Sequence, residues 1–342
     1  MDLGPVAMRK PDVAGITKQL DQMGAKKILL QLPDGLKPEA FELFSKLSAR
    51  YSVIISSDPF YGACDAGTVE SYREVDCIVQ LGHSPIPNLH YPKPMIFEEF
   101  LVDNNVEVDP STFEVLRSRG YRRIGLLFSV QYKDVAEGIR NILLKTGFEP
   151  LIGPVDGRMK YPGQVLGCNF SAAHLISDDA ECFLVVSTGK FHAIGVQLST
   201  EKETFLLDLN SRSIESVSRE TDEFLRMRYA RISRALDAEN FCIVMDTKIG
   251  QYREKLAYVV KEQVEGMGKN AIMLKTSEVR PSDYENLRCD AIVFTGCPRV
   301  SIDDEEKFKM PILTPPEFQR LFGFKKTRNY IMDEIVAVDQ IN

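Results

Sequence analysis

The sequence predicts three repeated α/β units with parallel four-stranded sheets around a pseudo-threefold axis. Three apolar, strand-like runs end in glycine: VDCIVQLG (75–82), ECFLVVSTG (181–189) and CDAIVFTG (289–296). Their final glycines, Gly82, Gly189 and Gly296, are separated by 107 residues in both intervals. Self-similarity at a fixed period is the sequence signature of internal repeats, so we interpret the runs as equivalent strands of three units.

The segments around these runs repeat as well. An earlier strand is expected at KKILLQLP (26–33), RRIGLLFS (122–129) and FCIVMDTK (241–248). Each is followed by a helical pattern with apolar residues every three or four positions, in PEAFELFSKLSAR, DVAEGIRNILLKTG and REKLAYVVKEQVEGMG. A second strand then follows in YSVIISS, FEPLIGP and NAIMLKT, and a fourth in PMIFEEF, ETFLLDL and MPILTPP. Apolar strands that alternate with amphipathic helices are typical of parallel sheets covered on both faces.

These patterns divide the chain into units at about 1–101, 102–210 and 211–342. The stretch after about residue 318 is polar, and one expectation is that it packs back on the first unit. In open α/β sheets, ligands bind beyond the carboxyl ends of the strands. The loops that follow the strands are therefore where site residues are expected.

Composition excludes several classes of function. The 342 residues are 44% hydrophobic and 27% charged, with a net charge of −7. This acidic balance argues against nucleic acid and anionic membranes as partners, because phosphate groups bind clustered Lys and Arg. No apolar run reaches the roughly 20 residues of a membrane span, and the N-terminus has no apolar signal region. We expect a cytoplasmic protein without direct contact to membranes or nucleic acid.

Seven cysteines are present, and none forms a CxxC pair. In a reducing cytosol we expect no structural disulfides. Four cysteines lie at the starts of apolar strand runs, where free cysteine is usually a buried core residue: Cys77, Cys182, Cys242 and Cys289.

The other three cysteines follow a glycine by one or two residues in turn-rich loops: Cys64 in FYGACDAG, Cys168 in YPGQVLGCNFS and Cys297 in FTGCPRV. Glycine permits close approach of the backbone to a bulky cofactor, and thiolates select soft metals and iron–sulfur clusters. One such cysteine per unit predicts a shared metal site. A zinc ion with a fourth or open position, a four-iron cluster with one free iron, and three unrelated thiols remain open at this point.

Several segments resemble the diphthamide-biosynthesis 3-amino-3-carboxypropyl transferases. The three cysteine segments YGACD (61–65), DGRMKYPGQVLGCN (156–169) and TGCPR (295–299) carry the likeness, with support from LPDGLK, LGHS, STGKFHAIG and LTPPE. YPGQVLGCN is long and specific, whereas YGACD and GCPR are short. The similarity extends from about residue 15 to about residue 320, and the compact length is similar to the archaeal form, which works as a homodimer.

The resemblance implies a [4Fe–4S] cluster bound by Cys64, Cys168 and Cys297, with S-adenosylmethionine on the fourth iron. An electron from a donor protein would break the bond from the sulfonium to Cγ. The 3-amino-3-carboxypropyl radical would add to a histidine of translation elongation factor 2, and methylthioadenosine would leave. The CxxxCxxC motif of ordinary radical enzymes is absent from this chain, as this different cleavage would require.

Eight polar residues after strands are candidates for the S-adenosylmethionine pocket: Asp34, Tyr61, His83, Gln131, Gln164, His192, Asp208 and Arg299. The Arg299 guanidinium suits the methionine carboxylate, and Asp34 or Asp208 suits the amine or a ribose hydroxyl. His83 and His192 occupy similar positions after the glycine-ended strands. A buried structural histidine with one backbone hydrogen bond is the simpler interpretation of each, and neither is expected to be a cluster ligand.

Other cofactors have little support in the sequence. Neither GxGxxG after a strand nor GxxxxGK[ST] nor GxSxG occurs. Two alternatives to the transferase stay open. The first is a dehydratase similar to quinolinate synthase, which also joins three α/β repeats around a three-cysteine cluster. The second is a zinc-stabilised binding module without catalytic activity.

Overall fold

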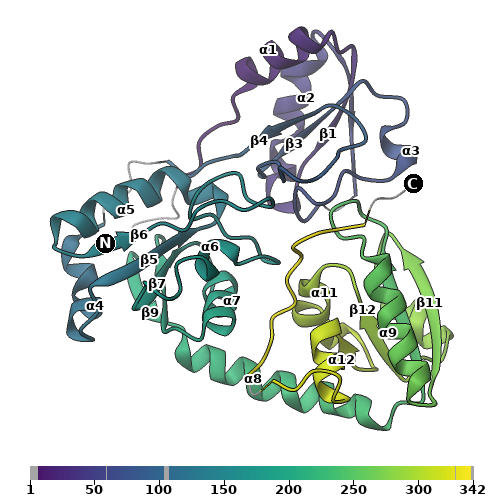
Figure 1. Cartoon of the computed structure of the whole chain (residues 1–342). Helices are drawn as coiled ribbons and strands as arrows, with labels where there is room; N and C mark the ends of the chain where they lie inside the picture. Colours follow the sequence, from purple (N-terminus) through teal and green to yellow (C-terminus); the bar gives the residue numbers. More distant parts are fainter. Residues whose placement is uncertain (1–6, 59, 104–107, 328, 340–342) are drawn as a thin grey trace.

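The computed structural model describes residues 7–58, 60–103, 108–327 and 329–339, which form three α/β units, each built on its own sheet (Figure 1). In every unit the first strand pairs with the second on one side and with the third on the other, and the fourth strand follows the third. All these pairings are parallel. The predicted three-unit α/β architecture is therefore confirmed.

The first unit carries the sheet β2-β1-β3-β4. Its elements are α1 (Val13–Met23), β1 (Lys27–Gln31), the short 3-10 helix η1 (Asp34–Glu39), α2 (Ala40–Ser48), β2 (Ser52–Ile55), α3 (Val69–Tyr72), β3 (Cys77–Leu81) and β4 (Met95–Glu98). Successive β1 residues bury on opposite faces, Ile28 and Leu30 against the core shared with α1 and α2, and Leu29 against a smaller core. Burial on both faces explains why these strands are continuously apolar.

The second unit has five strands in the order β6-β5-β7-β8-β9. Its elements are η2 (Pro110–Phe113), α4 (Glu114–Ser118), β5 (Arg123–Phe128), η3 (Val130–Tyr132), α5 (Lys133–Lys145), β6 (Glu149–Leu151), α6 (Ser171–His174), β7 (Cys182–Val186), α7 (Phe191–Thr200), β8 (Thr204–Asp208) and β9 (Ser213–Ser216). The expected sheet of four parallel strands is wrong here, because β9 adds an antiparallel edge and extends this unit beyond residue 210. A turn in which Asn210 N donates to Asp208 Oδ1 reverses the chain, and the polar SIES run gave no apolar signal.

The third unit carries the sheet β11-β10-β12-β13. Its elements are α8 (Ser218–Ile232), η4 (Ser233–Asp237), β10 (Asn240–Asp246), α9 (Glu254–Gly266), β11 (Asn270–Thr276), α10 (Pro281–Asn286), β12 (Ala291–Phe294), α11 (Pro298–Asp303), η5 (Glu305–Lys307), β13 (Ile312–Leu313) and α12 (Pro315–Leu321). Helix α8 runs from the second unit to the third along the lower edge of Figure 1. Arg228 of α8 is buried and bonds Glu305 and Glu317, which fixes the helix to the third unit.

The segment after α12, residues 329–339, crosses the space between the second and third units towards the first (yellow in Figure 1). We call it the C-terminal strap. Its Ile335 N donates to Cys168 O at 2.8 Å, and its Asp339 N donates to Tyr252 O at 2.8 Å. Contact with the first unit includes a hydrogen bond of 3.4 Å from Asn88 Nδ2 to Val336 O. The strap therefore touches all three units. The sequence led us to expect packing on the first unit, and the strap also packs on the second and the third.

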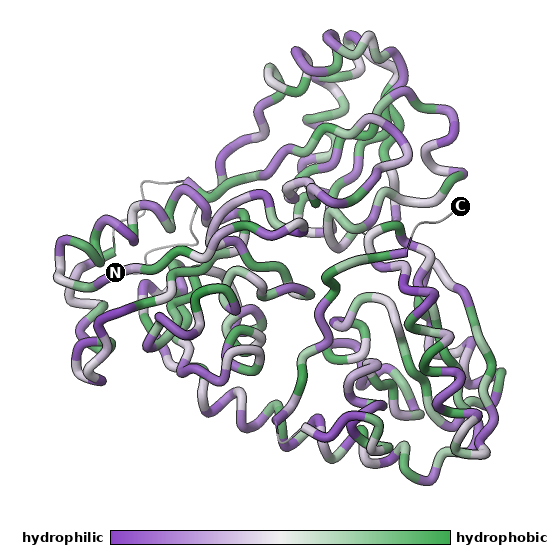
Figure 2. The backbone as a smooth tube through the Cα atoms, in the orientation of Figure 1, coloured by the Kyte–Doolittle hydropathy of each residue, from purple (hydrophilic) through white to green (hydrophobic). Residues whose placement is uncertain are grey.

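The four strand-type cysteines are buried, as the apolar runs predicted. Figure 2 shows hydrophobic (green) stretches of the chain in all three units. Cys77 and Cys182 are free thiols. Cys242 and Cys289 form a disulfide with a Cα–Cα distance of 5.8 Å, which contradicts the expectation of no structural disulfides. The reason is the parallel pairing of β10 with β12, which places both side chains in one core. No helix of the described residues is long and apolar enough to span a membrane.

Candidate functional site

Cys64, Cys168 and Cys297 lie in loops at the carboxyl ends of the strands. Cys64 follows β2, Cys168 follows β6, and Cys297 follows β12. The first two therefore come after the second strand of their unit and the last after the third strand. The sheets repeat and each unit supplies one cysteine, but the three cysteines do not occupy equivalent positions in their units.

Each of these cysteines is presented by a tight turn. Leu166 and Asn169 exchange two backbone hydrogen bonds of 3.0 and 3.3 Å, so Gly167 and Cys168 form the tip of a two-residue turn. Gly167 is packed so closely that an added Cβ would lie 3.0 Å from Arg299 Cδ. Cys297 immediately precedes α11, whose first residue is proline. Turns of this kind expose a side chain while the backbone remains hydrogen bonded.

The three cysteines converge on one half-buried place. Burial raises the pKa of Cys64, and the charges of Cys168 and Cys297 raise it further. Burial likewise raises the pKa of Cys297 to about 12, with a second contribution from Cys168. Side chains whose charges influence one another in this way lie in the same region of the molecule. Three cysteines that are more than 100 residues apart in sequence thus share one site.

Gln251, in the loop after β10, links two of the cysteines. Its Nε2 donates to Cys64 Sγ at 3.2 Å, and its Oε1 accepts from Cys297 N at 3.0 Å. The neighbouring Gly250 N donates to Cys64 O at 2.9 Å, and an added Cβ on Gly250 would lie 2.5 Å from Cys64 Cα. The first and third units therefore meet backbone to backbone at the site.

Arg253 holds the turn that carries Cys297. Its Nε donates to Thr295 O at 2.6 Å and its Nη2 to Gly296 O at 3.0 Å. Asp333 of the C-terminal strap neutralises the guanidinium through two short bonds. Because Arg253 and Asp333 are both buried, this pair fixes the strap beside the cysteines.

The donor set consists of three thiols, one from each unit. Thiolates are ligands of zinc and of iron–sulfur clusters. In an iron–sulfur cluster each thiolate binds a separate iron. Three cysteines are therefore a donor set that could hold a cluster through three of its irons.

Two of the predicted pocket residues, Gln131 and Gln164, join the first and second units, and His83 lies in the segment that they contact. Gln131 Nε2 donates to Gly82 O at 2.9 Å, and Gln164 Nε2 donates to Ser84 Oγ at 2.9 Å. Burial lowers the pKa of His83 to about 4, so this histidine is neutral near pH 7. Its Nδ1 is buried without a hydrogen-bond partner, so the backbone bond expected for a structural histidine is not made at that atom.

Two further candidates lie between the second and third units. Arg299 stacks on the Phe191 ring at 4.2 Å and is paired with Asp303 through Nε and Nη2. Burial, together with the charge of Arg299, lowers the pKa of the adjacent His192 to about 4. The donors of Arg299 expected to hold a methionine carboxylate are thus already occupied, although the residue is placed beside the site.

The remaining candidates are exposed or have local partners. Asp34 is paired with Lys37 at 2.7 Å and is mostly exposed. Tyr61 is 74% exposed. Asp208 accepts a hydrogen bond within its own turn. Nothing in these contacts connects the three with the cysteines, and a role in the pocket stays a prediction for each.

Sequence reasoning missed Gln251, Arg253 and Arg158. A signal for the first two existed, because QYRE (251–254) after β10 matches QYKD (131–134) after β5. Gln131 was selected in one copy of this pattern and Gln251 was overlooked in the other. Arg158 lies within the DGRMKYPGQVLGCN segment but precedes Cys168 by ten residues, and only the folded chain brings it to the thiol.

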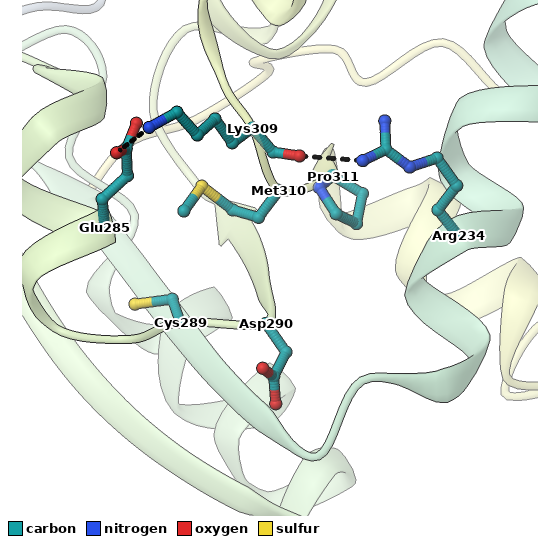
Figure 3. Close-up of a pocket in the computed structure, with 7 residues that line it drawn as sticks. All are labelled: Arg234, Glu285, Cys289, Asp290, Lys309, Met310 and Pro311. Carbon is teal, nitrogen blue, oxygen red and sulfur yellow. Dashed lines mark hydrogen bonds and ion pairs between the residues drawn. The ribbon is translucent and has the colours of Figure 1, made fainter.

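A surface hollow of the third unit lies away from this site. A volume of about 490 Å³ is lined by Arg234, Glu285, Cys289, Asp290, Lys309, Met310 and Pro311 (Figure 3). It lies at the amino ends of β10 and β12, opposite the cysteine loops. Lys309 is paired with Glu285, and Arg234 donates to Lys309 O. These polar groups already have partners, so the hollow gives no indication of a ligand.

Comparisons with known proteins agree with the geometry. Residues 32–331 match the family of diphthamide synthesis proteins. The chain is 32% identical over 325 residues to the 2-(3-amino-3-carboxypropyl)histidine synthase of Pyrococcus horikoshii, covering 94% of this chain and 92% of the relative. It is 25% identical over 335 residues to the protein of the same name from Methanocaldococcus jannaschii, covering 92% and 88%.

A solved structure shares the whole fold. The crystal structure of Dph2 from Pyrococcus horikoshii with a 4Fe-4S cluster superposes with a TM-score of 0.87 at 29% identity. The match covers 98% of this chain and 97% of that chain. These relatives share sequence and fold over nearly the full length, which favours the transferase over the dehydratase and the zinc module.

Proposed function

The chain belongs to the diphthamide synthesis protein family, and we propose that it works as a 2-(3-amino-3-carboxypropyl)histidine synthase. The observation that carries the proposal is the convergence of Cys64, Cys168 and Cys297 from three units on one half-buried place, where Gln251 hydrogen bonds to both Cys64 and Cys297. Three thiolates on a four-iron cluster leave one iron without a protein ligand. That iron is the position for S-adenosylmethionine.

Each part of the site has a distinct task in this proposal. The cysteines bind three irons, Gln251 holds the Cys64 and Cys297 loops together, and Arg253 with Asp333 fixes the turn before Cys297. When bound, the cluster would supply one electron to the sulfonium, so that the bond to Cγ breaks and methylthioadenosine leaves. The acceptor is a histidine, for which we propose the modified histidine of translation elongation factor 2.

The wider setting follows from the same proposal. We infer a cytoplasmic enzyme, because elongation factor 2 acts on cytoplasmic ribosomes, and an external electron donor, because the chain has no second redox cofactor motif. A homodimer is predicted from the family likeness. The net charge of −7 suits a basic docking face on a protein substrate.

The test is anaerobic purification with reconstitution, followed by dithionite, S-adenosylmethionine and elongation factor 2. The expected result is an iron–sulfur absorption band and a mass gain of one aminocarboxypropyl group on the factor. A bound cluster without any modification of the factor would favour the dehydratase over the transferase. Stoichiometric zinc without iron would support the binding module and overturn the proposal.

A further inference from the structure

Arg158 is a buried arginine with unused donors. Its side chain is 1% exposed, and its Nη2 donates to Gly250 O at 3.2 Å. Its Nε and Nη1 are buried without a hydrogen-bond partner, and no carboxylate of the described residues forms an ion pair with it. Leaving a buried charge unpaired is strongly unfavourable. Such a group indicates a partner that the polypeptide itself does not supply.

The position of Arg158 identifies the missing partner. The guanidinium lies close enough to the Cys168 thiol for its charge to lower the pKa of that thiol, which burial raises. Gly250, which accepts the one hydrogen bond from Arg158, donates its own N–H to Cys64 O. Tyr91 lies near both residues, because the charges of Cys64 and Arg158 both act on its pKa, which burial raises. Arg158 therefore reaches from the second unit into the junction where the three cysteines meet.

The neighbouring arginines do not share this property. Arg253 is neutralised by Asp333, and Arg299 is neutralised by Asp303. Among the described residues near the cysteines, Arg158 is thus the arginine whose charge has no counterion. A cluster with three thiolate ligands has a negative net charge, and one added electron makes this charge more negative. A fixed cation beside it stabilises the reduced form more than the oxidised form.

We propose that Arg158 donates its Nε–H and Nη1–H to sulfur atoms of the cluster at Cys64, Cys168 and Cys297, and thereby raises the reduction potential of that cluster. The inference rests on the proposed function for the presence of the cluster. It concerns one reversible step, in which the oxidised cluster takes one electron from an added reductant. In this proposal Arg158 contacts the cofactor and adjusts its reduction potential.

The experiment compares the wild type with Arg158→Met and Arg158→Lys after anaerobic reconstitution. Iron and sulfide content is measured first, and the reduction potential is then obtained by an EPR-monitored titration without S-adenosylmethionine. In Arg158→Met the equilibrium constant for one-electron reduction of the cluster is expected to fall at least tenfold. For a one-electron couple this corresponds to a reduction potential lower by about 59 mV. Arg158→Lys keeps the charge but loses the planar fork, so a smaller shift in the same direction is expected.

Arg299→Met provides a matched control. Arg299 is also a cation beside a cluster cysteine, but it is half-exposed and paired with Asp303. Its removal is expected to change the potential less than the removal of Arg158, because the charge of Arg299 is screened by Asp303 and by solvent. A second readout uses cluster-free protein: Arg158→Met should raise its melting temperature, because the variant removes an unpaired buried charge. A merely structural arginine would lower it.

The outcomes separate this inference from the proposed function. If the wild type binds no iron, the proposed function and this inference are both overturned. If Arg158→Met holds a full cluster with an unchanged potential, the inference alone is overturned. Loss of S-adenosylmethionine binding at an unchanged potential would assign Arg158 to the methionine carboxylate instead. If Arg158→Met fails to retain the cluster, the test uses Arg158→Lys. A lower potential than in the wild type then supports the inference, and an unchanged potential overturns it.

Discussion

Arg253 and Asp333 face each other in the interior through two short hydrogen bonds, Nη1 to Oδ1 at 2.8 Å and Nη2 to Oδ2 at 2.6 Å. They are 80 residues apart in the chain. Because Arg253 also donates to the carbonyls of Thr295 and Gly296, the pair connects the C-terminal strap with the turn that carries Cys297. The strap is therefore part of the site's framework.

Asp333→Ala should destabilise the fold strongly. The change leaves Arg253 buried with an uncompensated charge, which costs about 3–5 kcal/mol. Asp339→Ala is the matched control on the same strap, since Asp339 is less buried and its partner Lys255 is exposed. We expect a loss below about 1 kcal/mol for the control, measured by urea unfolding. Equal losses in the two variants would show that the buried pair has no special role.

Gly250→Ala should separate the first and third units at the site. An added Cβ would lie 2.5 Å from Cys64 Cα and Cβ, so the backbone of one loop must move. We expect loss of cluster retention, followed as iron content after gel filtration. Gly138→Ala, in α5 with no atom within 4 Å of the new Cβ, should instead raise stability by about 0.5–1 kcal/mol. Full iron content in Gly250→Ala would contradict the close packing of Gly250 on Cys64.

Cys64→Ala, Cys168→Ala and Cys297→Ala should each abolish cluster retention and activity, because each removes one of three ligands. The matched controls are Cys77→Ala and Cys182→Ala, whose thiols are buried in β3 and β7. These controls should keep both properties and lose about 1 kcal/mol from packing. Iron analysis and the elongation factor assay measure the outcome. A ligand variant with full activity would refute the three-cysteine assignment.

His174 should make the anchorage of the strap dependent on pH. Its Nε2 lies 2.7 Å from Glu334 Oε1, and this hydrogen bond raises the pKa of His174 above its ordinary value of 6.5. The folded state therefore binds the proton more tightly than the unfolded chain. The resulting stability is fully present below pH 6.5 and is lost as the pH rises through the raised pKa.

Melting temperatures between about pH 5 and 8 test this dependence. His174→Gln should flatten the decline that the wild type shows towards higher pH. His90→Gln, a change of an exposed histidine, should leave the profile as it is. An identical decline in His174→Gln and the wild type would show that the pair with Glu334 does not contribute.

The local pattern of the sequence was sufficient for the architecture. The strands are continuously apolar because both faces of each sheet are covered, and the glycine period of 107 residues identified their repetition. Cys64, Cys168 and Cys297 were separated from the core cysteines by their glycine-rich loops alone. These features are encoded within a few residues of one another, so they can be recognised without the fold. The polar strand β9 lacks such a signal, and only its pairing with β8 identified it.

The environment of the cysteines was decided by the tertiary structure. Gln251 reaches Cys64 across 187 residues of sequence, and Arg158 becomes an unpaired buried cation only when Gly250 and Cys168 close around it. The pairing of Arg253 with Asp333 likewise depends on how the C-terminal strap crosses the units. Sequence therefore determined the three-unit fold and the three thiols. Tertiary structure decided which charges and hydrogen bonds surround them, because those depend on contacts between distant segments that no local pattern specifies.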